Sequence, residues 1–246
     1  MCVCVRPSDS PLDPAVVDEQ RAWLSPESLD YYRRNRQSPE DLYPSERFFL
    51  PDVLRQVDSM LDVGCAAGGF SEIVRVLNPG VRYVGVDISP AFVETARAEH
   101  PHSQFLLGDG LNFSTPDGSF DLVHSSGVLH LNLRYREMIA AMWRQTRRFL
   151  LFDLRLTRGT PEVGRMESPF DEATPVSLPY VVLTIPEVEQ MFRALDPRPA
   201  RVAIRGYRHR ASAHAKLAEQ DLLMAFVLAE KTPGAPATTF DIELDG

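Results

Sequence analysis

Short apolar runs alternate with amphipathic stretches from residue 59 to residue 155. The apolar runs are bounded by turn residues, as in strands buried on both faces of a parallel sheet, and they lie at 59–64, 82–87, 104–109, 120–125 and 148–155. Helix-like stretches separate them at 69–77, 90–99 and 131–146. Because crossover helices cover both faces of such a sheet, the pattern predicts an α/β fold, a three-layer, Rossmann-like doubly wound sheet.

The strand–helix alternation ends after residue 155. Residues 157–183 are rich in proline and show no clear period, which predicts an irregular insertion of a kind that is usually functional or mobile. A capping box from Thr184 to Glu187 predicts one more helix. The apolar runs at 200–208 and 222–230 predict a strand pair, so we expect the sheet to be mostly parallel with an antiparallel strand near the C-terminus.

Serine residues mark helix starts before the first strand, at Ser25, Ser38 and Ser45. We therefore divide the chain into a helical N-terminal extension, 1–57, a main domain, 58–231, and a tail, 232–246. The extension is rich in aromatic residues, for which core packing is the simplest role. Together with the insertion, it could instead close as a lid over a mostly apolar pocket.

The stretch LDVGCAAGGF, residues 61–70, runs from the first strand into a glycine-rich bend. In an open parallel sheet, ligands bind beyond the carboxyl ends of the strands, and glycine lets the backbone approach a ligand closely. The bend has no lysine, which excludes a Walker-type phosphate loop, and Ala66 makes the match to a dinucleotide fingerprint incomplete. The bend therefore predicts a ligand site without identifying the ligand.

Three acidic residues at successive strand ends narrow the choice of cofactor. Asp87 suits a ribose, because a carboxylate accepts hydrogen bonds from both hydroxyls, and Asp109 suits an exocyclic adenine amine. Asp62 would repel the diphosphate of a nicotinamide cofactor but favours a cationic one. S-adenosylmethionine combines an ammonium, a sulfonium, a ribose and an adenine without a phosphate. Each acid could alternatively serve only as a cap or an ion-pair partner.

The chain resembles the class I S-adenosylmethionine-dependent methyltransferases, small-molecule type. The matching stretches occur in that family's order and are LDVGCAAGGF (61–70), YVGVDISP (83–90), FLLGDG (105–110) and SFDLVHSSGVLHL (119–131). The resemblance implies that S-adenosylmethionine is the cofactor and that its methionine part lies against Gly64, Ala66 and Gly68. It also implies acidic support for that part from Asp62.

The same resemblance implies roles for the later strand ends. Asp87 would bind the ribose. Three residues would lie at the adenine: Ile88, Asp109 and Gly110. Two would lie next to the reactive methyl: Ser125 and Ser126. The family usually has glycine where this chain has Ala66, a difference of one methyl group that we expect cofactor binding to survive.

His130 is the candidate general base, because it follows the fourth strand end and histidine titrates near neutral pH. A helix-orienting role for His130 is an equally good interpretation, and His124 is expected to pack within the strand. The chain lacks the Asn-Pro-Pro-aromatic motif of amino-directed nucleic-acid methyltransferases, a catalytic cysteine and a metal-ligand cluster. These absences favour methyl transfer to an oxygen or nitrogen of a small molecule, such as a secondary metabolite.

Net charge and cysteine content limit the partners and the compartment. A net charge of −8 and a pI near 5.3 argue against a nucleic-acid partner. The three cysteines form no disulfide framework, and we see no signal peptide or membrane span, so we expect a cytoplasmic protein without a membrane partner. The oligomeric state is left open.

Three alternatives remain. The arginine-rich stretch 198–216 would suit an RNA or protein methyltransferase, although an ordinary solvated face is the simpler interpretation. A non-catalytic partner protein that binds S-adenosylmethionine would share the same motifs. A nicotinamide oxidoreductase with a degenerate bend is the least favoured.

Overall fold

The computed structural model of the chain describes Trp23, Phe170 and the ranges 25–168, 176–218, 221–232, 234–235 and 237–245. Residues 1–22 of the predicted N-terminal extension lie outside the described residues. So do residues 171–175 of the predicted insertion.

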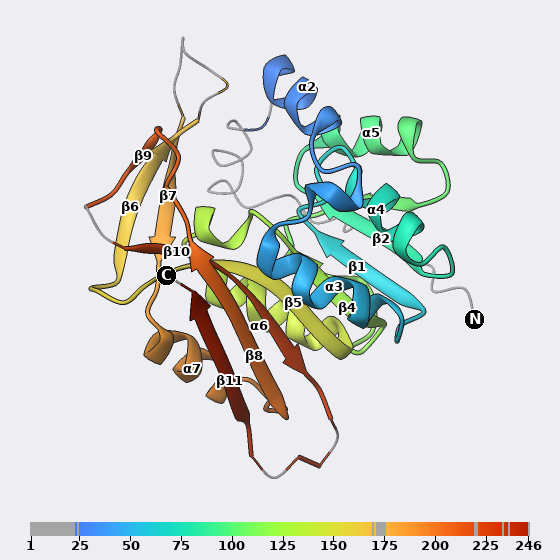
Figure 1. Cartoon of the computed structure of the whole chain (residues 1–246). Helices are drawn as coiled ribbons and strands as arrows, with labels where there is room; N and C mark the ends of the chain where they lie inside the picture. Colours follow the sequence, from blue (N-terminus) through green and yellow to red (C-terminus); the bar gives the residue numbers. More distant parts are fainter. Residues whose placement is uncertain are drawn as a thin grey trace.

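One large sheet forms the centre of the molecule (Figure 1). Its strands are β1 (Ser59–Val63), β2 (Arg82–Asp87), β3 (Gln104–Leu107), β4 (Phe120–Ser125), β5 (Thr146–Thr157), β8 (Arg201–Arg208), β10 (Leu222–Glu230) and β11 (Thr239–Asp245). They are ordered β11-β8-β10-β5-β4-β1-β2-β3. Among these pairings, only those of β10 are antiparallel. The predicted sheet, mostly parallel with an antiparallel strand near the C-terminus, is confirmed.

Helices cover both faces of this sheet, which confirms the three-layer prediction. Alternate strand residues point to opposite faces. Met60 and Tyr83 pack in the cluster that includes α3 (Pro44–Leu54), α4 (Phe70–Leu77) and α5 (Pro90–Glu99). Leu61 and Val84 pack on the other face, against α6 (Tyr135–Gln145) and α7 (Ile185–Arg193). Within the described part of the chain, no helix is long and apolar enough to cross a membrane.

Two stretches are more regular than the sequence suggested. The predicted irregular insertion, 157–183, contains β6 (Glu162–Glu167) and β7 (Ser177–Val182), which form a second sheet with β9 (Ala215–Lys216). The predicted tail, 232–246, contains β11, which pairs in parallel with β8. In β11, apolar residues pack against the core at every second position while acidic residues face arginines of β8. Both stretches depend on partners distant in the chain, which explains why local patterns missed them.

The helix α2 (Pro26–Arg34) of the N-terminal extension lies above the main sheet in Figure 1, whereas α3 packs against the sheet. Its start is capped as predicted, since the backbone N–H of Ser28 donates to the Ser25 side chain over 3.1 Å. Tyr32 packs edge-on against Phe92 of α5, with ring centroids 5.5 Å apart. The rings of Tyr31 and Tyr32 also pack against Phe170, which lies between β6 and β7, with centroids 5.3 and 5.9 Å apart. The extension thus bridges α5 and the second sheet.

Candidate functional site

A cavity of about 240 Å³ lies beyond the carboxyl ends of β1, β2, β3 and β4. Most of the residues predicted for the site line it: Asp62, Gly64, Ala66, Asp87, Ile88, Asp109, Gly110 and Ser126. The N-terminal extension supplies a second part of the wall, including Tyr31, Tyr32, Arg36 and Tyr43, and β7 supplies Leu178. Both segments suggested as a lid therefore contribute to the cavity.

The glycine-rich bend forms one side of the cavity. The N–H groups of Gly64 and Cys65 donate to the carbonyl of Val86 over 2.8 and 3.1 Å, which fixes the bend against β2. Gly64 has a φ of +82°, and a Cβ there would lie 2.2 Å from a methyl carbon of Val128. Only glycine therefore fits at this position.

Ala66 is in the left-handed region, with a φ of +47°. A non-glycine residue in that region carries a strain of roughly 1–2 kcal/mol, part of which is offset because glycine has more entropy to lose on folding. We expect Ala66→Gly to raise the free energy of unfolding by up to about 1 kcal/mol. Urea denaturation measures this difference.

Ala67 provides the matched control. It is next in sequence, buried, and not among the residues with positive φ. Ala67→Gly should therefore lower the free energy of unfolding by roughly 0.5–1 kcal/mol. If both substitutions destabilise the protein equally, Ala66 is not strained.

Asp87 joins the end of β2 to the bend. Its Oδ2 accepts from the N–H of Ala66 and its Oδ1 from the N–H of Ser89, each over 2.9 Å. Burial is the main reason why the pKa of this carboxyl is raised to about 6, and the negative charge of Asp62 adds to it. Each oxygen retains capacity for further hydrogen bonds, and the side chain lines the cavity.

Asp109 terminates the segment after β3. Its Oδ1 accepts from the N–H groups of Leu111 and Asn112 over 2.9 and 3.0 Å, and its Oδ2 accepts from the Asn112 side chain over 2.9 Å. The turn-capping alternative is thus a real part of its role. Because Asp109 and Gly110 also line the cavity, a ligand role is compatible with the cap.

A network of buried, charged side chains lies beside the cavity. His124 donates from Nδ1 to Asp62 over 2.7 Å and from Nε2 to Glu46 over 3.0 Å. The Tyr83 hydroxyl donates to the other oxygen of Asp62. Burial alone would lower the pKa of His124, but the two carboxylates outweigh it and raise the pKa to about 9. The imidazole is therefore protonated at neutral pH, and Asp62 is an ion-pair partner as well as a cavity residue.

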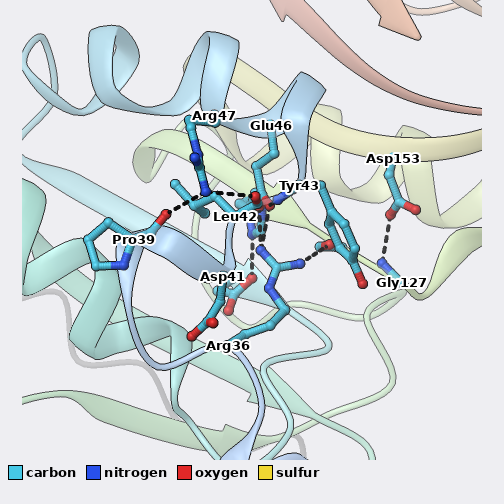
Figure 2. Close-up of polar contacts among 12 residues, drawn as sticks. Arg36, Pro39, Asp41, Leu42, Tyr43, Glu46, Arg47, Gly127 and Asp153 are labelled. Atoms are coloured by element: carbon cyan, nitrogen blue, oxygen red, sulfur yellow. Dashed lines mark hydrogen bonds and ion pairs between the residues drawn. The ribbon is translucent and has the colours of Figure 1, made fainter. Parts of the chain in front are cut away.

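Arg36, in the N-terminal extension, belongs to the same network of buried charges (Figure 2). Its Nη2 lies 2.6 Å from both carboxylate oxygens of Glu46, and its Nη1 donates to the Ser126 hydroxyl over 2.5 Å. Glu46 is fully buried in α3. Neither Arg36 nor Glu46 was predicted from the sequence, because a charged residue in a helical extension is ordinarily a surface residue.

Two predicted cofactor residues do not line the cavity. Ser125 is fully buried, and its hydroxyl donates back to the carbonyl of Val63 over 2.9 Å. Gly68 has a φ of +86°, and a Cβ there would lie 2.9 Å from the side chains of Ala96, His100 and Phe105. Both residues shape the bend and the strand end, so their predicted contact with a ligand is not supported by this geometry.

His130 also lies outside the cavity lining. It is buried, and its ring packs edge-on against Tyr180 with centroids 5.1 Å apart. Burial is the main cause that lowers its pKa well below 6.5, and the charge of Arg155 acts in the same direction. The geometry therefore gives no support to His130 as a general base. His124, expected to pack within its strand, is buried there but also bridges two carboxylates.

No group of three or more histidine, cysteine, aspartate or glutamate side chains among the described residues is arranged to hold a metal ion. The thiol of Cys65 lies within the bend, and burial raises its pKa well above 9. It is therefore a neutral thiol at physiological pH.

Residues 61–151 match a sequence family described as Methyltransferase domain. A 69-residue stretch is 35% identical to a trans-aconitate 2-methyltransferase of Methylobacterium radiotolerans, covering 28% of this chain and 26% of that protein. The match thus spans only about a quarter of that relative's length.

The fold is similar to that of solved methyltransferase structures. A SAM-dependent methyltransferase from Methanosarcina mazei has a TM-score of 0.57 at 17% identity, over 77% of this chain and 98% of that chain. A phosphoethanolamine N-methyltransferase 2 of Haemonchus contortus, in complex with phosphomonomethylethanolamine and S-adenosylhomocysteine, has a TM-score of 0.61 at 12% identity. That similarity covers 90% of this chain and 61% of that chain.

Proposed function

We propose that this chain, which belongs to the class I S-adenosylmethionine-dependent methyltransferases, transfers a methyl group from S-adenosylmethionine to an oxygen or nitrogen of a small molecule. The observation that carries the proposal is that Asp62, Asp87 and Asp109, from three strand ends, line one cavity. The sequence family and the fold support the same assignment.

The residues present fit this cofactor. Asp87 keeps acceptor capacity for the ribose hydroxyls, and Asp109 for the adenine amine. Asp62 offers negative charge to the ammonium, and Gly64 and Ala66 line the cavity beside it. The cavity contains three carboxylates, which suit a cationic cofactor and disfavour a diphosphate.

When bound, S-adenosylmethionine supplies a methyl group that is already activated by the sulfonium. The protein then has to orient the acceptor and exclude water. Trp23, Tyr31 and Tyr32 of the N-terminal extension contribute aromatic surface to the cavity, and Leu131 and Leu178 contribute aliphatic surface. These groups favour an acceptor with a substantial apolar part.

The first test is direct binding followed by turnover. We expect calorimetry to detect S-adenosylhomocysteine binding, and incubation with S-adenosylmethionine and a panel of phenols, hydroxy acids and amines to release S-adenosylhomocysteine. Binding without turnover on any acceptor would favour the non-catalytic partner protein. A preference for a nicotinamide dinucleotide over both nucleosides would refute the methyltransferase assignment.

An RNA substrate is disfavoured because most of the basic residues in the stretch 198–216 are paired with acids. Arg201 bonds to Glu230 and Asp241 over 2.9 and 2.8 Å, and Arg205 bonds to Asp241 over 3.0 Å. Lys216 pairs with Glu167. Since acids within the chain pair with four of the six cations of the stretch 198–216, it presents less free positive charge to a polyanion than its composition suggests. We therefore retain a small molecule as the proposed methyl acceptor. From the sequence, we also expect the protein to act in the cytoplasm.

A further inference from the structure

Arg36 enters the cavity from a strained turn between α2 and the short helix η1 (Pro39–Asp41). Its φ is +56°, in the left-handed region that an arginine rarely adopts. The turn rests on the glycine-rich bend, because a Cβ at Gly69 would lie 3.1 Å from the carbonyl oxygens of both Asn35 and Arg36. Backbone strain of this kind is concentrated where a side chain has to be held in a particular place.

The guanidinium of Arg36 is held by several contacts, but one of its hydrogen-bond donors has no acceptor. It lies between the rings of Tyr43 and Phe70, 4.8 and 4.9 Å from their centroids. Its Nη atoms bond to Glu46 and Ser126, as described above. Its Nε is buried and has no hydrogen-bond partner. A buried donor without an acceptor is costly, so an additional acceptor beside this guanidinium would be favourable.

The charges around the bend alternate in sign. Arg36 and Asp62 both line the cavity, and His124 and Glu46 link them through buried ion pairs. The net charge of the four side chains is zero, since Arg36 and protonated His124 balance the two carboxylates. A ligand group that carries both a carboxylate and an ammonium matches this arrangement, with its carboxylate at Arg36 and its ammonium at Asp62.

We propose that Arg36 binds the α-carboxylate of the cofactor's methionine part, so that cofactor binding and the docking of the N-terminal extension are coupled. This inference rests on the proposed function and extends it by a residue outside the resembling motifs. The Arg36 side chain lines the cavity and is 15% exposed, so a carboxylate in the cavity can bond to the exposed part of its guanidinium. Binding of the carboxylate also fastens the turn at Asn35 and Arg36 onto the bend, which closes that side of the cavity.

The test compares two ligands that differ only in the carboxylate, S-adenosylhomocysteine and S-adenosyl-3-thiopropylamine, by calorimetry without any acceptor. We expect the wild-type protein to prefer S-adenosylhomocysteine by roughly 10–100-fold, as for a charge-assisted hydrogen bond. In the double variant Arg36→Gln/Glu46→Gln, which removes both charges of the pair together, the preference should fall below about threefold. Arg36→Lys, which keeps the charge but loses the planar guanidinium, should give an intermediate preference.

Arg34→Gln is the matched control, because Arg34 lies on the same extension and is largely exposed. It should keep the wild-type preference. A preference that persists in the double variant and in Arg36→Lys overturns the inference, and so does an equal weakening of both ligands, which would make Arg36 purely structural. In both cases the proposed function stands, whereas a wild-type protein that binds neither ligand refutes the proposed function and this inference together.

Discussion

Glu46→Ala is expected to lower the free energy of unfolding by about 3–5 kcal/mol, the largest stability effect we foresee for a single substitution. The fully buried carboxylate is bonded to Arg36 over 2.6 Å and to His124 over 3.0 Å. Its removal leaves two buried cations without their shared partner. Chemical denaturation near pH 7 measures the change.

The pKa of Glu46 defines a second readout of the same prediction. Burial alone would raise this pKa, but Arg36 and His124 outweigh it and hold the pKa below its usual value of 4.5. The ion pairs therefore contribute stability above the unfolded pKa, and this contribution is lost as the pH falls through the lower, folded pKa. Wild type and Glu46→Ala should accordingly converge in stability at acidic pH.

Glu40→Ala is the control for Glu46→Ala, because Glu40 is an exposed acid of the same extension. It should change the free energy of unfolding by less than about 0.5 kcal/mol. If Glu46→Ala is as mild as Glu40→Ala, the network of buried charges does not hold the extension in place.

Asp87→Ala is expected to weaken the binding of S-adenosylhomocysteine by about 1–3 kcal/mol, through lost charge-assisted hydrogen bonds to the ribose. The same carboxylate also holds the N–H groups of Ala66 and Ser89. Its loss should therefore loosen the bend as well as remove a ligand contact. Calorimetry at pH 7.5 measures the affinity, and unchanged binding would refute the ribose assignment.

The pH dependence of cofactor binding shows how much of the contribution of Asp87 comes from its negative charge rather than from the size of its side chain. Its pKa is about 6 in the free protein, mainly through burial. Ribose hydroxyls donate to the ionised form, so the affinity should rise with pH up to about 6 and level off above it. Between pH 7.5 and pH 5 the affinity should fall by about tenfold, since only about a tenth of the carboxyl is ionised one unit below its pKa.

Asp87→Asn is the control for this pH profile. It keeps the size of the side chain and one oxygen acceptor but cannot ionise. Its affinity should be low and nearly flat from pH 5 to pH 7.5. A variant that keeps the wild-type slope would assign the pH dependence to another group.

Local sequence patterns predicted the elements that carry the cofactor side of the site. The strands β1, β2 and β4 and the helix α5 lie where apolar runs and a Ser89 cap placed them. Asp62, Asp87 and Asp109 follow from these assignments, because the ends of adjacent parallel strands meet at one edge of the sheet. Strand periodicity, turn residues and caps act over a few residues, so they can be recognised without knowledge of the fold.

The rest of the site, including the part proposed for the methyl acceptor, is formed by contacts between segments that are distant in the sequence. His130 follows β4 in sequence, but the packing of Tyr180 from β7 buries it outside the cavity. Arg36 and Glu46 are charged residues of a helical extension, where a surface position is expected. They are largely buried instead, because Glu46 pairs with both Arg36 and His124 of β4. The second sheet and β11 likewise exist only through strands far along the chain.

By itself, the sequence determined the order of strands and helices from residue 59 to residue 155, the glycine-rich bend and the three carboxylates at the strand ends. The tertiary structure decided which charged side chains are buried and which segments enclose the cavity. The physical reason is that a buried charge is stable only beside its partner. In this protein the partners of Arg36, Glu46 and Asp62 come from three separate segments, which only the folded chain brings together.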